Sequence, residues 1–398
     1  MTEGTPRESA GKLLAINQSV STYFRDLADG MAAQGLEVTL LAGYLELTEG
    51  YTPPFEWIRG CELRRSPAWR RLWTWGKFTL QAMRAMIRHR KGLVLLVTNP
   101  PLVPWVAPML RRLFGVRYIE LIYDIYPDVM GRMGMLRAGG RMYRFLRHLS
   151  SRAHRRAECV ITLGRCMRQT VLGQLDDPAA VEVHVIPNWA NIEEIRPRPR
   201  QDNPFSIAQG LTDKFVVMYS GAFGATHDID SIVLAAEQLL DLGDLQIVLI
   251  GGGTREAEVR RLVEQKALPN LRLLPRQPVD QVKFLLTAAD CQIVCLDEGF
   301  EGVSVPSKTY NALAAGTAIL AVSPPDTELT DLVAEHDCGI WLPPRDVAGL
   351  AAAIRKLHDD RPLLARMQAN SRRAAVEHYS KGPCVEQYVK LLMPLFRA

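Results

Sequence analysis

Residues 302–322 are the part of the chain best equipped for chemistry. They predict a loop, a helix that begins around Pro306, a glycine stop at Gly316 and a short apolar strand. The free N–H groups at the start of a helix attract anions. Ser307 adds a hydroxyl donor there and Lys308 adds a full positive charge, so the segment is equipped to hold a diphosphate. The alternative is a well-capped surface helix whose lysine lies in water.

A second glycine-bearing loop follows the apolar run at residues 215–220. Gly221 and Gly224 lie where a ligand could approach the backbone closely, because glycine has no side chain. His227 could contact a phosphate there, or it could be a solvated residue at the start of a helix that Asp228 caps. A Gly-x-x-Gly loop is not the full dinucleotide fingerprint, so it indicates a phosphate site only in combination with other features.

Charged side chains also follow other apolar runs. Arg276 and Glu301 each come after such a run in the second half of the chain, and Asp124 and Asp128 come after one in the first half. Asp124 is a candidate general base or hydroxyl binder. Asp128 is expected to cap a short helix instead.

Unbroken apolar runs alternate with helical patterns along the whole chain. Such runs are typical of strands covered on both faces, and the alternation indicates parallel sheets with crossover helices. We therefore expect an α/β protein with two doubly wound Rossmann-like domains facing a cleft, and ligands beyond the carboxyl ends of the strands. The expected divisions are a first domain at 1–190, an extended linker at 191–213, a second domain at 214–380 and a C-terminal helix at 381–398, which could cross back to the first domain.

Composition bounds the class of protein. The 398 residues are 47% hydrophobic and 23% charged, as in soluble globular proteins. The seven scattered cysteines form no Cys-x-x-Cys pair, which argues against a disulfide framework or a zinc site and favours a reducing compartment. Residues 1–12 are polar and lack the apolar core of a signal peptide, so a loose tail is expected. The apolar run at 93–110 contains four prolines, which argues against a membrane span.

Positive charge is concentrated in the first half of the chain. Residues 1–196 contain 27 Lys and Arg against 18 Asp and Glu, a net charge of +9, and the remaining residues contain 21 against 25, a net charge of −4. Residues 59–91 hold ten basic residues and one acid, and residues 132–168 hold ten arginines and one acid. This asymmetry indicates an anionic partner of the first half.

Tryptophans and arginines are interleaved in residues 67–90. Such a mixture suits the headgroup layer of an anionic membrane surface, where each basic residue gains about 1 kcal/mol. The alternative is a helix that packs its apolar face on the first domain. Nucleic acid is a less favoured partner, because no nucleic-acid-binding motif accompanies the charge.

Taken together, these segments resemble the bacterial GT-B fold glycosyltransferases of the family 4 type, in the group that builds O-antigen, capsule or colanic acid. The resemblance covers nearly the whole chain, with the matching segments in the expected order. They are residues 17–18, 36–43, 98–102, 123–128, 185–189, 219–221, 227–228 and 303–316.

The resemblance implies transfer of a sugar from a nucleotide sugar, with a UDP-sugar as the expected donor, with retention at the anomeric carbon and without a metal. The nucleotide would bind the second domain. The residues implied for donor binding are Gly221, Gly224, His227, Arg276, Ser307, Lys308 and Asn311.

The acceptor would bind the first domain, and Asp124, Lys308 and Glu301 are the candidate catalytic residues. A lipid-linked glycan is the expected acceptor. The expected location is the cytoplasm, at the inner face of the cell membrane.

Some positions depart from the family pattern. Two glutamates common in the family are replaced by Val303 and Asn311, although Asn311 can bond a ribose hydroxyl and Glu301 is near enough in sequence to substitute. The family's Arg and Lys after the Tyr219 strand are replaced by Ala222 and His227.

The glycine-rich loop that usually follows residues 17–18 is almost absent. That loss and the missing glutamates leave open a non-catalytic protein that binds a nucleotide sugar or stabilises another transferase. A nucleotide-sugar epimerase is a further alternative, because such enzymes can share the two-domain architecture, but they need cleft carboxylates and histidines and this sequence has few histidines near the strand ends. The sugar, the base, the accepted hydroxyl and the oligomeric state are not specified by the sequence.

Overall fold

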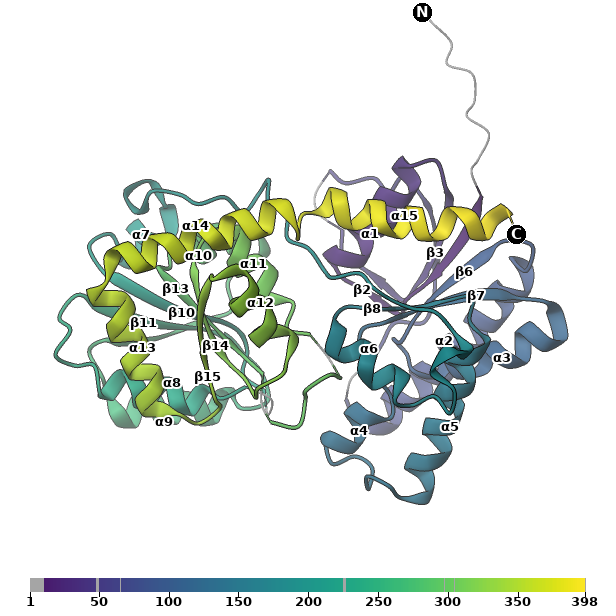
Figure 1. Ribbon diagram of the computed structural model, residues 1–398, viewed down its shortest axis with the longest axis horizontal. Helices are drawn as coiled ribbons and strands as arrows, with labels where there is room; N and C mark the ends of the chain where they lie inside the picture. The colour runs from purple at the N-terminus through teal and green to yellow at the C-terminus, as the bar shows by residue number, and fades with distance from the viewer. Residues whose placement is uncertain are drawn as a thin grey trace, which may run out of the picture. The chain divides into compact units, whose positions relative to one another are not determined.

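The computed structural model describes residues 11–47, 50–64, 66–224, 227–296, 298–303 and 305–397. A loose tail was expected at residues 1–12, and residues 1–10 of it lie outside the described residues. The chain divides into two compact units (Figure 1). Unit 1 comprises Met1–Pro187, Gly302–Ser304 and Gly382–Ala398, and unit 2 comprises Asn188–Glu301 and Val305–Lys381.

Unit 1 is built on a parallel sheet, which in the described residues has seven strands in the order β5-β3-β1-β6-β7-β8-β9. The central strand β6 is buried along its whole length, as its unbroken apolar run predicts. The strands are β1 (Lys12–Ile16), β3 (Glu37–Ala42), β5 (Glu56–Arg59), β6 (Leu93–Val97), β7 (Arg117–Ile122), β8 (Val160–Thr162) and β9 (Val183–Val185). A separate short parallel pair is formed by β2 (Ser19–Val20) and β4 (Tyr44–Leu45).

Helices connect the strands of unit 1, and two of them, α2 and α3, pack on the sheet through a shared apolar core. The helices are α1 (Thr22–Ala33), α2 (Ala68–Arg88), α3 (Leu102–Phe114), α4 (Asp128–Arg132), α5 (Arg141–Arg156), α6 (Arg165–Leu172), η1 (Pro178–Ala180) and α15 (Lys381–Arg397). The C-terminal helix α15 lies beside α1 (Figure 1), where Val385 packs so closely on Gly30 that a Cβ at Gly30 would be 2.5 Å from a Val385 methyl carbon.

Unit 2 is built on a second parallel sheet, whose described strands number six in the order β12-β11-β10-β13-β14-β15. Successive residues of β10 enter two different cores, since Phe215, Val217 and Tyr219 pack on one face of the sheet and Val216 and Met218 pack on the other. The strands are β10 (Phe215–Ala222), β11 (Leu245–Gly252), β12 (Leu271–Pro275), β13 (Cys291–Cys295), β14 (Ala318–Val322) and β15 (Gly339–Leu342). Burial on both faces explains why the inner strands β10, β11, β13 and β14 show no alternation.

The helices of unit 2 follow the predicted rhythm. They are η2 (Arg200–Asp202), α7 (Pro204–Gln209), α8 (Ile229–Glu237), α9 (Glu256–Lys266), η3 (Val279–Gln281), α10 (Val282–Leu286), α11 (Lys308–Ala315), α12 (Glu328–His336), α13 (Val347–Asp359) and α14 (Arg361–Glu377). Two parallel-sheet α/β units were the fold expected from the sequence, and this expectation is confirmed.

Residues 191–213 differ from the extended linker that their composition predicts. They contain η2 and α7, and Phe205 enters the core of unit 2. The buried Asn203 explains this local structure, because its Oδ1 accepts from the N–H groups of Phe205 and Ser206 at the start of α7, and its Nδ2 donates to Phe284 O at 2.8 Å. A helix cap and a long-range hydrogen bond thus hold the segment on unit 2.

We expect Asn203→Ala to lower the free energy of unfolding by about 2–3 kcal/mol, because the helix loses its cap and Phe284 O loses a buried donor. Urea unfolding followed by circular dichroism measures the change. Asn370→Ala is the control, because Asn370 is only half-buried and its hydrogen bonds are exposed to solvent, so the change should cost less than about 1 kcal/mol. Equal midpoints for the two variants would contradict this account of the segment.

Candidate functional site

The side chain of Lys308 lies directly against the backbone of Gly221, at the carboxyl end of β10. A Cβ at Gly221 would be 1.7 Å from Lys308 Nζ and 2.1 Å from Cε. Only glycine at this position therefore leaves the ammonium group where it is. The Lys308 Nζ donates to the Tyr219 hydroxyl at 3.1 Å and lies 4.6 Å from the centre of the Tyr219 ring.

A second glycine makes this close packing possible. β10 pairs with β11 so that Gly221 is opposite Gly251, and a Cβ at Gly251 would be 1.8 Å from the Gly221 carbonyl oxygen. At this end the two strands present backbone without side chains, and the Lys308 side chain packs against it at Gly221. The Tyr219 hydroxyl, which donates to Ala222 O at 2.7 Å, fixes the strand end from within.

Helix α11 positions Lys308 because it begins at that residue. Its N-cap is Ser307, and it ends at Gly316, whose φ of +67° gives the left-handed cap that the sequence predicts. Tyr310 and Leu313 are buried in the core of unit 2 and hold the helix in place. The positive end of α11 and the Lys308 ammonium therefore lie together.

Burial sets the protonation of this cluster. It lowers the pKa of Lys308 to about 8, with Cys295 opposing the shift and Arg276 adding to it. Burial also lowers the pKa of His227 to about 4, and the Lys308 charge contributes to that shift. At neutral pH the site therefore combines a largely protonated lysine with a neutral histidine.

A pocket of about 160 Å³ opens beside Gly221, at the ends of β10, β11 and β12. Arg276 lies in its wall, where Nη2 donates to Gly252 O at 3.5 Å. The pocket is lined by Ser220, Gly221, Ala222, Ile250, Gly251, Arg276, Gln277, Val282 and Leu285. A bare backbone, a guanidinium and a neighbouring ammonium around one hollow can accept an anionic group.

Gly224, Asn311 and Glu301, which were also predicted as site residues of unit 2, have fewer close contacts than Gly221 and Lys308. A Cβ at Gly224 would be 3.4 Å from His227 Nδ1, an ordinary contact, so no residue in the described part of the chain demands glycine there. Asn311 is half-buried on α11. Glu301 lies in the loop before α11, and its Oε1 accepts from Gly299 N at 3.0 Å.

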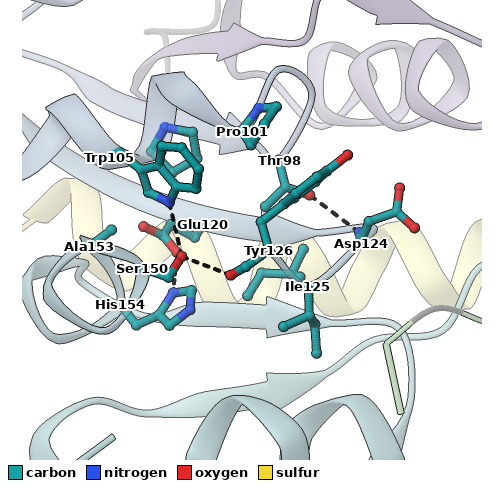
Figure 2. Close-up of a pocket in the computed structure, with 12 residues that line it drawn as sticks. Thr98, Pro101, Trp105, Glu120, Asp124, Ile125, Tyr126, Ser150, Ala153 and His154 are labelled. Carbon is teal, nitrogen blue, oxygen red and sulfur yellow. Dashed lines mark hydrogen bonds and ion pairs between the residues drawn. The ribbon is translucent and has the colours of Figure 1, made fainter. Parts of the chain in front are cut away.

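Asp124 belongs to unit 1, where it follows the end of β7. Its N–H donates to Thr98 Oγ1 at 3.3 Å, and Figure 2 shows its carboxylate pointing away from the neighbouring buried pair of Glu120 and His154. Burial raises the pKa of Asp124 to about 6. A carboxyl group tuned in this way can exchange a proton near neutral pH.

The buried pair beneath Asp124 was not predicted from the sequence. Glu120 Oε2 lies 2.5 Å from His154 Nδ1, and both side chains are almost fully buried (Figure 2). Ser150 joins the same cluster, accepting from Trp105 Nε1 at 2.9 Å and donating to Tyr126 O at 2.8 Å. The available signal was a glutamate inside the unbroken apolar run of β7, since a charge in such a strand needs a partner.

Asp128 was expected from the sequence to cap a short helix, but it does not cap α4. The N-cap is Pro127, and the Asp128 carboxylate instead accepts from Tyr143 Oη at 3.0 Å and from Gln174 Nε2 at 2.6 Å. It is therefore a structural link between α4, α5 and the end of α6.

Among the described residues, no group of three or more His, Cys, Asp or Glu side chains is placed to hold a metal ion. In the same part of the chain, no helix combines the length and apolar character needed to cross a bilayer.

Comparison with family models matches both units of the chain. Residues 19–189 match the glycosyl transferase 4-like domain, and residues 202–374 match the glycosyl transferases group 1 domain.

Two bacterial relatives match most of the chain. The probable glycosyltransferase WbjE of Pseudomonas aeruginosa is 31% identical over 309 residues, which are 77% of this chain and 76% of WbjE. The putative colanic acid biosynthesis glycosyl transferase WcaI of Escherichia coli K12 is 24% identical over 85% of this chain and 88% of that protein.

Solved structures share the fold at lower identity. Sucrose-phosphate synthase from Thermosynechococcus elongatus has a TM-score of 0.77 with 20% identity, over 97% of this chain and 99% of the other. Anabaena HepE, solved in complex with UDP-glucose, has a TM-score of 0.73 with 14% identity, over 96% and 100%. The chain therefore belongs to the family 4 glycosyltransferases of the GT-B fold that act in cell-surface glycan biosynthesis.

Proposed function

We propose that the protein transfers a sugar from a UDP-sugar, with retention at the anomeric carbon, to a lipid-linked or polysaccharide acceptor. The observation that carries the proposal is the Lys308 ammonium, which lies against Gly221 at the start of α11. The complex of HepE with UDP-glucose supports this choice of donor.

In this proposal unit 2 binds the donor diphosphate. Departure of the nucleotide concentrates negative charge on the diphosphate, and a preorganised cation beside it lowers the barrier. Lys308 supplies that cation, and Ser307 and the first N–H groups of α11 add donors. Arg276 supplies a second positive charge from the pocket wall, so these groups meet the electrostatic demand without requiring a metal.

Neutral groups complete the donor site in this proposal. His227, with its lowered pKa, offers a hydrogen bond without a competing charge. Asn311 bonds a ribose hydroxyl in place of the glutamate common in the family. Glu301, from the loop before α11, takes the role of the other missing carboxylate.

Unit 1 receives the acceptor in this proposal, with Asp124 as the group that orients or deprotonates the accepting hydroxyl. A carboxyl pKa of about 6 suits a group that must gain and lose a proton near neutral pH.

Helix α2 supports the proposal of a lipid-linked acceptor at an anionic membrane surface. It begins at Ala68 and therefore includes Trp69, Trp73 and Trp75. Trp69, Leu72, Trp73 and Leu80 recur at helical spacing and are all more than half exposed, while the opposite face is buried. The exposed basic side chains Arg70, Lys77, Arg84 and Arg88 flank this stripe. An apolar stripe edged with cations suits a headgroup layer.

The direct test is a thermal-shift screen of nucleoside diphosphates and their sugars, followed by turnover measurements with the ligands that bind. We expect uridine ligands to raise the melting temperature, because a ligand that binds only the folded state stabilises it. Epimerised donor would contradict the proposal, and so would donor binding with no transfer to any acceptor.

We expect Lys308→Ala to lower kcat by on the order of a hundredfold or more, the scale for losing one group that stabilises developing charge. Gly221→Ala keeps the lysine but places a methyl group where Nζ now lies, so it should impair turnover in the same direction. Lys214→Ala, a surface change in the same unit, should leave the rate unchanged. Full activity in a folded Lys308→Ala protein would rule out the role of Lys308.

The affinity for UDP should fall as the pH rises. Lys308 has a lowered pKa of about 8 in the free protein, so it is charged at pH 7 and largely neutral at pH 9. The terminal phosphate of UDP, with a second pKa of about 6, is already ionised throughout this range. We expect about tenfold weaker binding at pH 9 than at pH 7, measured by calorimetry, because only the protonated fraction binds well. In Lys308→Gln the pH dependence of UDP affinity should disappear. If the dependence persists in this variant, a group other than Lys308 causes it.

Binding to vesicles should depend on the basic edge of α2. We expect Arg70→Glu with Lys77→Glu to weaken sedimentation with phosphatidylglycerol vesicles by tenfold or more, since each basic residue near anionic lipid gains about 1 kcal/mol. Arg260→Glu with Arg261→Glu on α9 changes the net charge equally and should have a smaller effect. If both variants lose vesicle binding equally, the effect comes from net charge alone and α2 is not the membrane-binding element.

A further inference from the structure

Unit 1 has two neighbouring hollows lined by arginines. One, of about 370 Å³, is bounded by Pro108, Arg111 and Arg112 of α3 and by Arg152 and Arg156 of α5. The other, of about 480 Å³, is lined by His148, Arg152, Arg155, Arg156 and Ala180. Because they share Arg152 and Arg156, we treat them together as the arginine groove.

The arginine groove lies at the edge of the sheet opposite Asp124. α3 ends at Phe114, just before β7 starts at Arg117, and α5 ends at Arg156, just before β8 starts at Val160. All strands of this sheet are parallel, so their starts share one edge, whereas Asp124 follows the end of β7. The six residues of β7 separate the two edges by about 20 Å. The groove is therefore not part of the acceptor site proposed above.

The positive charge of the groove is only partly neutralised by the protein. Arg111 pairs with Glu158 at 2.7 Å, and Arg155 lies 3.9 Å from an Asp176 carboxylate oxygen. Within the described ranges, no carboxylate comes within ion-pairing distance of Arg112, Arg152 or Arg156. This remaining set is called the unpaired arginines below.

Helix dipoles account for part of this arrangement. The carboxyl ends of α3 and α5 each carry about half a negative charge, which lowers the cost of placing cations there. That is less than the charge of the unpaired arginines. In addition, Arg155 Nε is buried and has no hydrogen-bond acceptor among the residues described. The groove therefore holds excess positive charge and an unused donor.

The choice of arginine narrows the chemistry of the ligand. The basic residues of segment 132–168 are ten arginines and no lysines. A guanidinium presents a rigid fork of N–H donors that matches two oxygens of a phosphate, whereas an ammonium acts as a point charge. A hollow lined by one sign of charge also concentrates counter-ions.

We propose that the arginine groove binds a ligand carrying two or more phosphate charges, presented on a soluble molecule or on a lipid headgroup. The volumes exceed that of a single ion and suit a diphosphate or a phosphate with an attached group. This site is separate from the donor site in unit 2 and does not depend on the function proposed for that site.

The test compares two variants of α5 that have the same net charge. R152Q/R156Q removes the two arginines shared by both hollows, and R141Q/R144Q removes two exposed arginines of the same helix that line neither hollow. Both are made in the full-length K308A protein, so that pyrophosphate cannot bind through Lys308. Circular dichroism and the thermal midpoint confirm that each variant is folded.

Binding of inorganic pyrophosphate is measured by calorimetry at low salt, and binding of vesicles that contain cardiolipin, whose headgroup carries two phosphates, by sedimentation. We expect R152Q/R156Q to weaken at least one of them by tenfold or more relative to R141Q/R144Q. A loss confined to pyrophosphate identifies a soluble ligand, and a loss confined to vesicles identifies a lipid headgroup. If the two variants bind both probes equally, or if neither probe binds the parent protein, the proposal is overturned.

Discussion

The contact between the Lys308 side chain and the bare backbone of Gly221 is the constraint on which the rest of unit 2 depends. It requires a glycine at the end of β10, a second glycine opposite it on β11, and a helix that begins at the lysine. It also requires a polar partner, which the Tyr219 hydroxyl provides. Burial in this packing lowers the pKa of the lysine to about 8, so the ammonium is poorly solvated and gains strongly from an anionic ligand.

The two units use burial of charge in different ways. In unit 2 the half-buried ammonium group of Lys308 lies at a strand end beside a pocket, where an anionic ligand can pair with it. In unit 1 the fully buried Glu120 is paired with His154 inside the fold, and Asp124 stands apart from that pair. The pair links β7 to α5, because its members come from these two elements. The Glu120–His154 pair therefore holds β7 in place, and Asp124 lies just after the end of this strand.

Much of this organisation could be predicted because local rules and the fold agree. Unbroken apolar runs marked the central strands, and proline followed by a glycine stop marked α11. The structure of residues 191–213 was missed because Asn203 organises that segment through a partner, Phe284, that is far away in the sequence. Asp128 has the residue type and position of a helix cap, but its carboxylate accepts hydrogen bonds from Tyr143 and Gln174 instead. The Tyr219 bond to Lys308 and the Glu120–His154 pair likewise depend on long-range packing that no spacing rule encodes.

A crystal structure of the protein with UDP would test the central claim most directly. The account predicts diphosphate oxygens within hydrogen-bond distance of Lys308 Nζ and of the first N–H groups of α11, with the phosphate chain lying over Gly221. UDP bound elsewhere in unit 2, with Lys308 still in contact only with Tyr219, would contradict it.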